Sequence, residues 1–141
     1  MTPLDVFALA VVVLFLKMLS VAWLQGAVRT KHDQFVRPED AEAYGSGEVA
    51  EEDVALADRA QRALRNDVEN IPIFLFLAWC GLEFGVWEAG MVAYLGVFVG
   101  ARVLHTITYL KALQPYRTLA YAVGNFMSLA VAGHVVVAVF G

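Results

Sequence analysis

Long runs of apolar residues alternate with shorter polar stretches along this chain. Four apolar blocks stand out, and they cover residues 6–24, 71–82, 91–110 and 119–140. A bilayer core of about 30 Å requires roughly 20 apolar helical residues, and the first, third and fourth blocks meet that length. The second block is shorter, but it continues backwards into a polar segment that completes a fourth helix. Because backbone groups in lipid need partners within their own segment, the pattern predicts four spanning helices.

The expected architecture is therefore an all-α integral membrane four-helix bundle, with residues 1–141 as one domain. We expect helices at about 5–28, 58–84, 90–112 and 117–140, joined first by a loop at about 30–57. The chain is 60% hydrophobic, above the roughly 45–50% of soluble domains, which agrees with a membrane location. The first apolar block lacks the basic flank and small-residue cleavage site of a signal peptide, so we expect it to be retained.

The basic residues outside the apolar blocks lie in two connections. Lys and Arg occur around the first connection, from Arg29 to Arg65, and around the third, at Lys111 and Arg117. The second connection, residues 83–90, has acidic residues and no basic ones. Since Lys and Arg favour the cytoplasmic side, we expect both termini to lie on the non-cytoplasmic side. The first and third connections then share the cytoplasmic side, where a functional site is expected.

Composition argues against several functional classes. The single cysteine, Cys80, excludes an intramolecular disulfide and a multi-cysteine metal site. No metal-ligand cluster is recognisable in the sequence, so we expect no metal. The net charge is −4 and the basic residues are interleaved with acidic ones, which gives no support for nucleic-acid binding.

Lys17 is an ionisable residue deep within the first apolar block. It precedes Arg29 by about 18 Å of helix at 1.5 Å per residue, which is too far for its ammonium to reach the membrane surface comfortably. Our hypothesis is that Lys17 pairs with Asp67 of the second helix. The alternative is a snorkelling side chain or a local water pocket.

Polar residues follow one side of each of the last three helices. They are Arg62, Arg65, Asn66, Glu69 and Asn70 in the second helix, Arg102, His105 and Tyr109 in the third, and Arg117, Thr118 and Tyr121 in the fourth. Residues three or four apart share a helix face. An Arg fork suits a carboxylate, an amide suits a peptide group and Glu suits an ammonium group. A structural ion pair explains any one residue, but the whole set predicts a polar ligand site, and a tripeptide fits it chemically.

The segments "RALRNDVENI", "GARVLHTITYL" and "PYRTLAY" resemble the MAPEG family, the membrane-associated proteins of eicosanoid and glutathione metabolism. The resemblance runs from Lys17 to Tyr121 and is greatest to the branch of glutathione transferases and glutathione-dependent prostaglandin E synthases. It implies a homotrimer that binds glutathione at its cytoplasmic side, between neighbouring subunits. By position it implies a glutathione shell of Arg29, Arg62, Arg65, Asn66, Glu69, Arg102, His105, Tyr109, Arg117 and Tyr121.

The same resemblance implies catalytic roles for Arg117, which would stabilise the glutathione thiolate, and Thr118, which would donate a hydrogen bond to the sulfur. The expected function is a membrane enzyme of the glutathione transferase or peroxidase type. It would conjugate glutathione to lipophilic electrophiles, reduce lipid hydroperoxides, or both. These partners would arrive from the membrane lipid along the first and fourth helices.

Three positions depart from the family pattern and keep alternatives open. Leu64 stands where that branch usually has His, Thr118 replaces the Ser of the prostaglandin synthases, and Pro72 comes one position early. A prostaglandin-E-synthase-like isomerase is therefore the second hypothesis. A non-catalytic lipid-binding scaffold is the third, although the retained polar residues argue against it. A small four-helix drug exporter ranks last, because Lys17 stands where such exporters need a membrane-embedded Glu.

Overall fold

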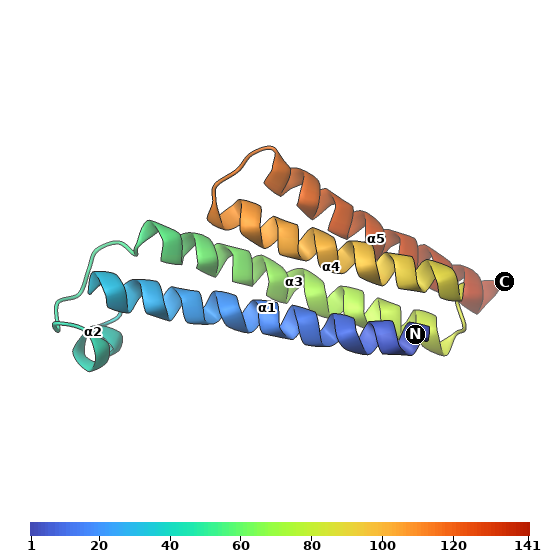
Figure 1. Ribbon diagram of the computed structural model, residues 1–141, viewed down its shortest axis with the longest axis horizontal. Helices are drawn as coiled ribbons and strands as arrows, with labels where there is room; N and C mark the ends of the chain where they lie inside the picture. Colours follow the sequence, from blue (N-terminus) through green and yellow to red (C-terminus); the bar gives the residue numbers. More distant parts are fainter.

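The computed structural model describes residues 1–141, and its regular structure is helical apart from one isolated bridge between Phe35 and Val49. Its five helices are α1 (Pro3–His32), α2 (Pro38–Tyr44), α3 (Ala55–Glu83), α4 (Glu88–Leu110) and α5 (Tyr116–Phe140). The four long helices form an elongated bundle with both termini at one end (Figure 1). The α1–α3 connection, which contains α2, and the α4–α5 connection both lie toward the other end, called here the loop end.

This architecture confirms the predicted fold class. Helices α1, α4 and α5 are long and apolar enough to cross a membrane, by length and composition. Helix α3 is as long as these, with 29 residues, but its first half is polar. The chain is therefore an integral membrane helical bundle in which one long helix has a polar beginning.

Capping interactions define both ends of α1. Thr2 and Asp5 form a reciprocal capping box at its start, with Thr2 Oγ1 accepting from the Asp5 N–H at 3.2 Å. At its end Asp33 has a left-handed backbone with φ 47°, and its N–H bonds to carbonyls of the last turn. Basic residues in that turn favour the negative end of the helix dipole. Helix α1 consequently extends to His32, past the end expected at residue 28.

The segment between α1 and α3, expected as a partly ordered loop over residues 30–57, contains the short helix α2. Pro38 occupies the first position of α2, where its fixed φ favours a helix and its missing N–H costs nothing. Phe35 is 4% exposed and its carbonyl accepts from the Ala50 N–H at 2.8 Å. A buried aromatic residue thus closes this segment on itself at the loop end.

The apolar core fills the half of the bundle nearer the termini. It contains Leu14 of α1, Phe74 of α3, Leu95 and Phe98 of α4, and Val131 of α5. The rings of Phe74 and Phe98 stack with centroids 3.6 Å apart and planes 5° apart. Toward the loop end, small apolar residues are joined by the buried polar side chains of the chain, Asp67, Arg102, His105, Thr106 and Thr108. A polar site can form among these.

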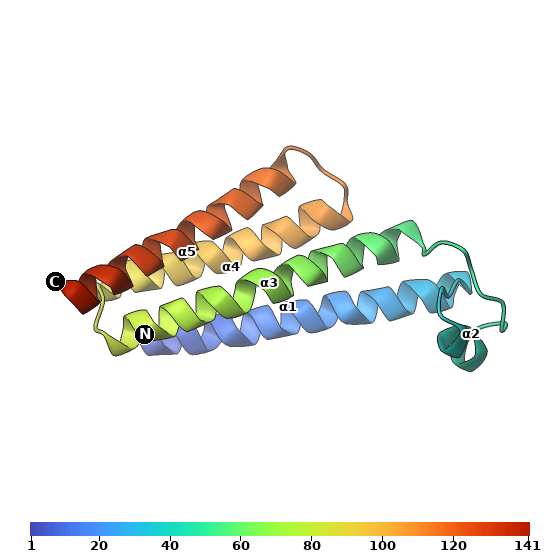
Figure 2. The same cartoon turned by 180° about the vertical axis from the view of Figure 1, so that it is seen from behind.

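Two helical hairpins make up the bundle, α1 with α3 and α4 with α5. The hairpins diverge toward the loop end in both views (Figures 1 and 2). Helices α1 and α5 lie at opposite edges of the bundle, with α3 and α4 between them. Within one chain, α1 and α5 are therefore separated by α3 and α4.

Candidate functional site

A charged pair marks the boundary between the apolar core and the polar half of the bundle. Lys17 Nζ donates a short hydrogen bond to Asp67 Oδ2, and this contact confirms the pairing hypothesis. The Asp67 side chain is fully buried and that of Lys17 is 9% exposed. Removing charges from water is costly, so each of these groups depends on the other for compensation. The pair joins α1 to α3 near the middle of both helices.

Arg102 extends this polar layer to α4 and α5. It is 1% exposed, and its Nη1 donates to Asn66 Oδ1 at 2.8 Å. Its guanidinium carbon lies 5.2 Å from the ring centroid of Phe98 and 5.7 Å from that of Tyr121. Cation–π contacts of this kind gain strength when the cation is shielded from water. Arg102 therefore organises residues from three helices around a single buried charge.

Aromatic rings continue the cluster from Arg102 toward the loop end. The ring of His105 lies 6.1 Å from that of Tyr121 and 5.5 Å from that of Tyr109, in an edge-on arrangement. The guanidinium carbon of Arg117 then lies 4.6 Å from the Tyr109 ring centroid. The distances therefore connect Asn66, a residue of α3, to Arg117 at the start of α5.

Arg117 and Thr118 occupy the first turn of α5, where Arg117 is half-buried and Thr118 exposed. Gln114, in the connection just before this helix, reaches both. Its amide satisfies its neighbours when the oxygen accepts from Arg117 Nε and Nη2, at 3.2 and 2.6 Å. In that orientation its nitrogen donates to Thr118 Oγ1 at 3.0 Å. The Gln114 side chain thus forms hydrogen bonds with the side chains of both Arg117 and Thr118.

Other predicted site residues lie on the exposed side of α3. Arg62 Nε bonds to Asp58 at 3.1 Å and Arg65 Nε to Glu69 at 3.2 Å, each pair separated by one helical turn. Exposed pairs of this spacing contribute only about 0.3–0.5 kcal/mol, so a ligand can rearrange them at little cost. Within one chain, Arg62, Arg65 and Glu69 form no hydrogen bond or ion pair with the Arg102–Arg117 cluster.

Arg29 lies in a third location, near the end of α1. Its Nε and Nη2 donate hydrogen bonds to the Asp53 carboxylate at 3.0 and 2.5 Å. Nη2 also donates to Gln61 Oε1 at 3.2 Å. These hydrogen bonds hold the pKa of the Asp53 carboxyl below its usual value of 3.8. The pair joins α1 to the segment just before α3.

The structure thus gathers six of the predicted site residues into one cluster between α3, α4 and α5. They are Asn66, Arg102, His105, Tyr109, Arg117 and Tyr121. Sequence reasoning missed Gln114 and Asp53, which hold Arg117 and Arg29. The available signal was position alone: Gln114 precedes Arg117 and Thr118 by three and four residues, the spacing at which side chains meet around a helix start.

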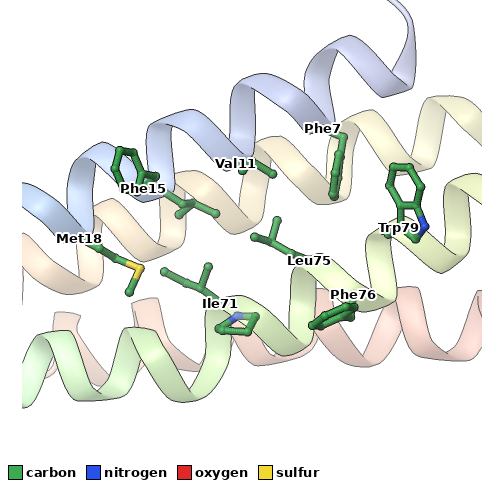
Figure 3. Close-up of a pocket in the computed structure, with 10 residues that line it drawn as sticks. Phe7, Val11, Phe15, Met18, Ile71, Leu75, Phe76 and Trp79 are labelled. Atoms are coloured by element: carbon green, nitrogen blue, oxygen red, sulfur yellow. The ribbon is translucent and has the colours of Figure 1, made fainter.

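An apolar groove of about 550 Å³ runs between α1 and α3, in the half of the bundle nearer the termini. Aromatic and aliphatic side chains from both helices point toward it (Figure 3). They include Phe7, Phe15, Met18, Leu75, Phe76 and Trp79. Pro72 also lines the groove, and it lies inside α3 without the N–H that a continuous helix would use. The volume is within the range of sites for small apolar molecules.

Comparison with known proteins identifies the family. The family model described as "MAPEG family" matches residues 7–137. The chain is 35% identical to human microsomal glutathione S-transferase 1 over 130 residues, which cover 89% of this chain and 84% of the relative. It is 37% identical to prostaglandin E synthase of the dog over 123 residues, which cover 86% and 80% of the two chains. The chain therefore belongs to the MAPEG family.

Proposed function

We propose that this protein is a glutathione-dependent membrane enzyme, with residues 1–141 as a single MAPEG domain. Its site would activate the glutathione thiolate for conjugation to lipophilic electrophiles, for reduction of lipid hydroperoxides, or for both. The observation that carries this proposal is the placement of Arg117. Its cationic group is held against Tyr109 and continues a polar cluster that reaches Asn66 across three helices.

The residue chemistry fits a tripeptide with two carboxylates, an ammonium group and a thiol. Arginine forks bind carboxylates through paired hydrogen bonds, Asn66 offers amide contacts and Glu69 suits the ammonium group. Arg62, Arg65 and Glu69 are exposed within one chain and engaged only in weak pairs of their own helix. Their exposure supports a site between neighbouring subunits, in which they would meet the Arg117 cluster of another copy. Membership of the family implies three subunits, and we propose a homotrimer on that basis.

Thiol activation follows from charge. An unperturbed thiol has a pKa of about 8.5, and a nearby cation lowers it by favouring the anion. Arg117 would supply that cation, and the Thr118 hydroxyl would donate a hydrogen bond to the sulfur. Glutathione, as co-substrate, would supply the thiol: its sulfur displaces a leaving group, or two molecules become a disulfide while a hydroperoxide becomes an alcohol and water. Arg117 would stabilise the negatively charged thiolate until the sulfur reacts.

Lipophilic partners would enter from the bilayer. Apolar side chains on α1 and α3 form a groove large enough for such a molecule in the half nearer the termini, from which it would have to move along α1 toward the loop end to meet the sulfur. Helices α1 and α5 of one chain lie at opposite edges of the bundle. An electrophile bound along α1 of one subunit and α5 of the next would reach the sulfur from the lipid side. The basic residues around the α1–α3 and α4–α5 connections support a cytoplasmic orientation of this site.

Isomerisation is the second candidate. The specific observation in its favour is that prostaglandin E synthase and microsomal glutathione S-transferase 1 are almost equally similar to this chain, at 37% and 35% identity. Thr118 retains a hydroxyl that can donate to sulfur. An isomerase would regenerate glutathione at the end of each turnover, whereas conjugation and peroxidase activity consume it.

Glutathione consumption therefore separates the candidates. The purified protein in detergent would be supplied with glutathione and, in turn, an aryl halide, a fatty acid hydroperoxide and a prostaglandin endoperoxide. We expect turnover of the aryl halide or the hydroperoxide with loss of free thiol, and loss of that turnover in Arg117→Ala. Turnover of the endoperoxide alone, with thiol conserved, would establish the isomerase. Absence of glutathione binding by calorimetry would overturn both candidates and favour the lipid-binding scaffold.

A further inference from the structure

Gln114 forms hydrogen bonds with Arg117 and Thr118, the two residues that the proposed function makes catalytic. It lies outside the helices that form the polar cluster. It lies in the connection between α4 and α5, directly before Pro115 and the first turn of α5. Its amide contacts Arg117 at 2.6 and 3.2 Å and Thr118 Oγ1 at 3.0 Å. A side chain in this position controls how both of its neighbours present their hydrogens.

The orientation of the amide follows from the charge of Arg117. A guanidinium group has only donors, so it requires an acceptor, and an amide nitrogen facing it would leave donors opposed to donors. The Gln114 oxygen must therefore face Arg117, which turns the amide nitrogen toward Thr118. That nitrogen has only hydrogens to offer, so Thr118 Oγ1 acts as the acceptor in this contact.

The direction of this last hydrogen bond has a chemical consequence. A hydroxyl group has one hydrogen and two acceptor sites. Because Thr118 Oγ1 accepts from Gln114, its own hydrogen remains available for another partner. If the amide were reversed, the Thr118 hydroxyl would spend that hydrogen on the Gln114 oxygen, which lies 3.0 Å away. Because Arg117 requires an acceptor, the Gln114 oxygen faces Arg117, and the Thr118 hydroxyl keeps its hydrogen for another acceptor.

We propose that Gln114 is a positioning residue that prepares Arg117 and Thr118 together for an anionic sulfur. This inference rests on the proposed function, because it takes a thiolate as the group that both residues meet. Gln114 accepts from Arg117 without neutralising it, since an amide carries no charge. It also directs the Thr118 hydrogen away from itself and toward the ligand. One neutral side chain therefore sets both the orientation of a cation and the donor role of a hydroxyl.

Two substitutions of similar size test this role. Gln114→Met keeps the length of the side chain but removes the hydrogen bonds to Arg117 and Thr118. Gln114→Glu replaces the amide nitrogen by a second oxygen, so that it accepts from both neighbours, neutralises Arg117 and takes the Thr118 hydrogen. If Gln114 only fills space or caps α5, Gln114→Met should leave the acidity of a bound thiol unchanged, whereas Gln114→Glu raises the pKa of that thiol by its charge alone. If it positions both groups, both variants should raise the pKa of that thiol, and Glu should raise it further.

The experiment is a pH titration of the glutathione thiolate by ultraviolet difference absorbance, using the full-length protein in detergent. We expect Gln114→Met to raise the pKa of the bound thiol by about one unit, a tenfold loss of thiolate at a fixed lower pH. We expect Gln114→Glu to raise it by about one to three units, as a nearby like charge does. Gln25→Met provides the matched control, because Gln25 is half-buried in α1 and lies away from Arg117 in sequence and helix.

The thermal midpoint of each variant, measured in the same detergent, separates positioning from folding. A pKa rise in Gln114→Met and Gln114→Glu, in that order and with midpoints close to wild type, establishes the role. An unchanged thiol pKa in Gln114→Met, with a normal thiolate in the wild type, overturns this inference and leaves the proposed function intact. No thiolate in the wild type would instead overturn the proposed function. Should Gln114→Glu fail to fold, the same titration of Gln114→Met still tests the positioning role. Gln114→Asn, whose amide is on a shorter side chain, should also raise the pKa of the bound thiol.

Discussion

Gly124 of α5 faces the guanidinium group of Arg102 in α4 so closely that a Cβ atom would lie 3.3 Å from both Nε and Nη2. Gly124 is buried and Arg102 is 1% exposed, so neither residue has free space around it. The absence of a side chain at Gly124 is what allows α5 to pack over a buried arginine. Arg102 is in turn the residue that connects α3, through Asn66, to the aromatic cluster.

The first prediction concerns this contact. In an exposed helix interior, Gly→Ala stabilises by roughly 1 kcal/mol through helix propensity. Gly133→Ala, on the same helix and with nothing within 4 Å of its Cβ, should show that gain as a higher thermal midpoint in detergent. Gly124→Ala should lose the gain or reverse it, because Arg102 must move away from Asn66. Equal midpoints for the two variants would show that Arg102 has room to move.

The second prediction concerns the buried pair between α1 and α3. Removing one partner of a buried ion pair leaves an uncompensated charge and costs about 3–5 kcal/mol. Lys17→Met alone and Asp67→Leu alone should each lower the thermal midpoint strongly, while the double variant should recover most of the loss. Ser20→Ala, one turn from Lys17 in α1, controls for changes in the helix itself. If the double variant is as unstable as the sum of the single variants, the two charges do not compensate each other.

The third prediction uses the pH dependence of the Arg29–Asp53 pair. Because Arg29 lowers the pKa of Asp53 in the folded state, the pair stabilises the fold above the unfolded pKa of about 3.9. That stabilisation is lost as the pH falls through the lower, folded pKa. Below pH 4 the wild type should therefore lose thermal stability more steeply than Asp53→Asn, whose side chain does not titrate. Parallel curves for the two proteins would contradict this role of Asp53.

The fourth prediction separates the ring of Tyr109 from its hydroxyl. Arg117 lies over the ring, and such cation–π contacts contribute about 0.5–1 kcal/mol at exposed sites and more when shielded. Tyr109→Phe keeps the ring, whereas Tyr109→Leu removes it. Under the proposed function, the leucine variant should raise the pKa of bound glutathione by about half a unit or more, and the phenylalanine variant should change it less. The same thiolate titration measures both, and a larger effect in Tyr109→Phe would argue against the ring as the support for Arg117.

The sequence predicted those features that depend on hydrophobic length and helical spacing. Apolar block lengths predicted the all-helical membrane bundle, and the depth of Lys17 led to the hypothesis of a pair with Asp67, which the structure confirms. The i, i+3 and i+7 spacing of Arg102, His105 and Tyr109 placed them on one helix face, and the rings of His105 and Tyr109 do meet. Helical periodicity was sufficient for these features because each depends on the spacing within one helix or on one charged residue inside an apolar block.

Features that depend on contacts between connections were not predictable in this way. Gln114 and Asp53 both lie outside the long helices. The spacing of Gln114 to Arg117 is local and could have been noticed, whereas the contact of Asp53 with Arg29, 24 residues away, required the fold. The polar stripe of α3 also divides in the structure: Asn66 turns toward Arg102, while Arg62 bonds to Asp58 on its own helix. A sequence pattern gives the angular spacing of residues, but the packing of neighbouring helices decides which of them are covered.

The central claim is that Arg117 stabilises the glutathione thiolate, and thiolate absorbance in the purified protein tests it most directly. The wild type and Arg37→Ala, which removes an exposed arginine from the start of α2, should both produce a thiolate signal when glutathione is added near neutral pH. Arg117→Ala should bind glutathione, measured by calorimetry, and show no signal at the same pH. A thiolate signal of wild-type size in Arg117→Ala would contradict the claim and assign the charge stabilisation to another residue.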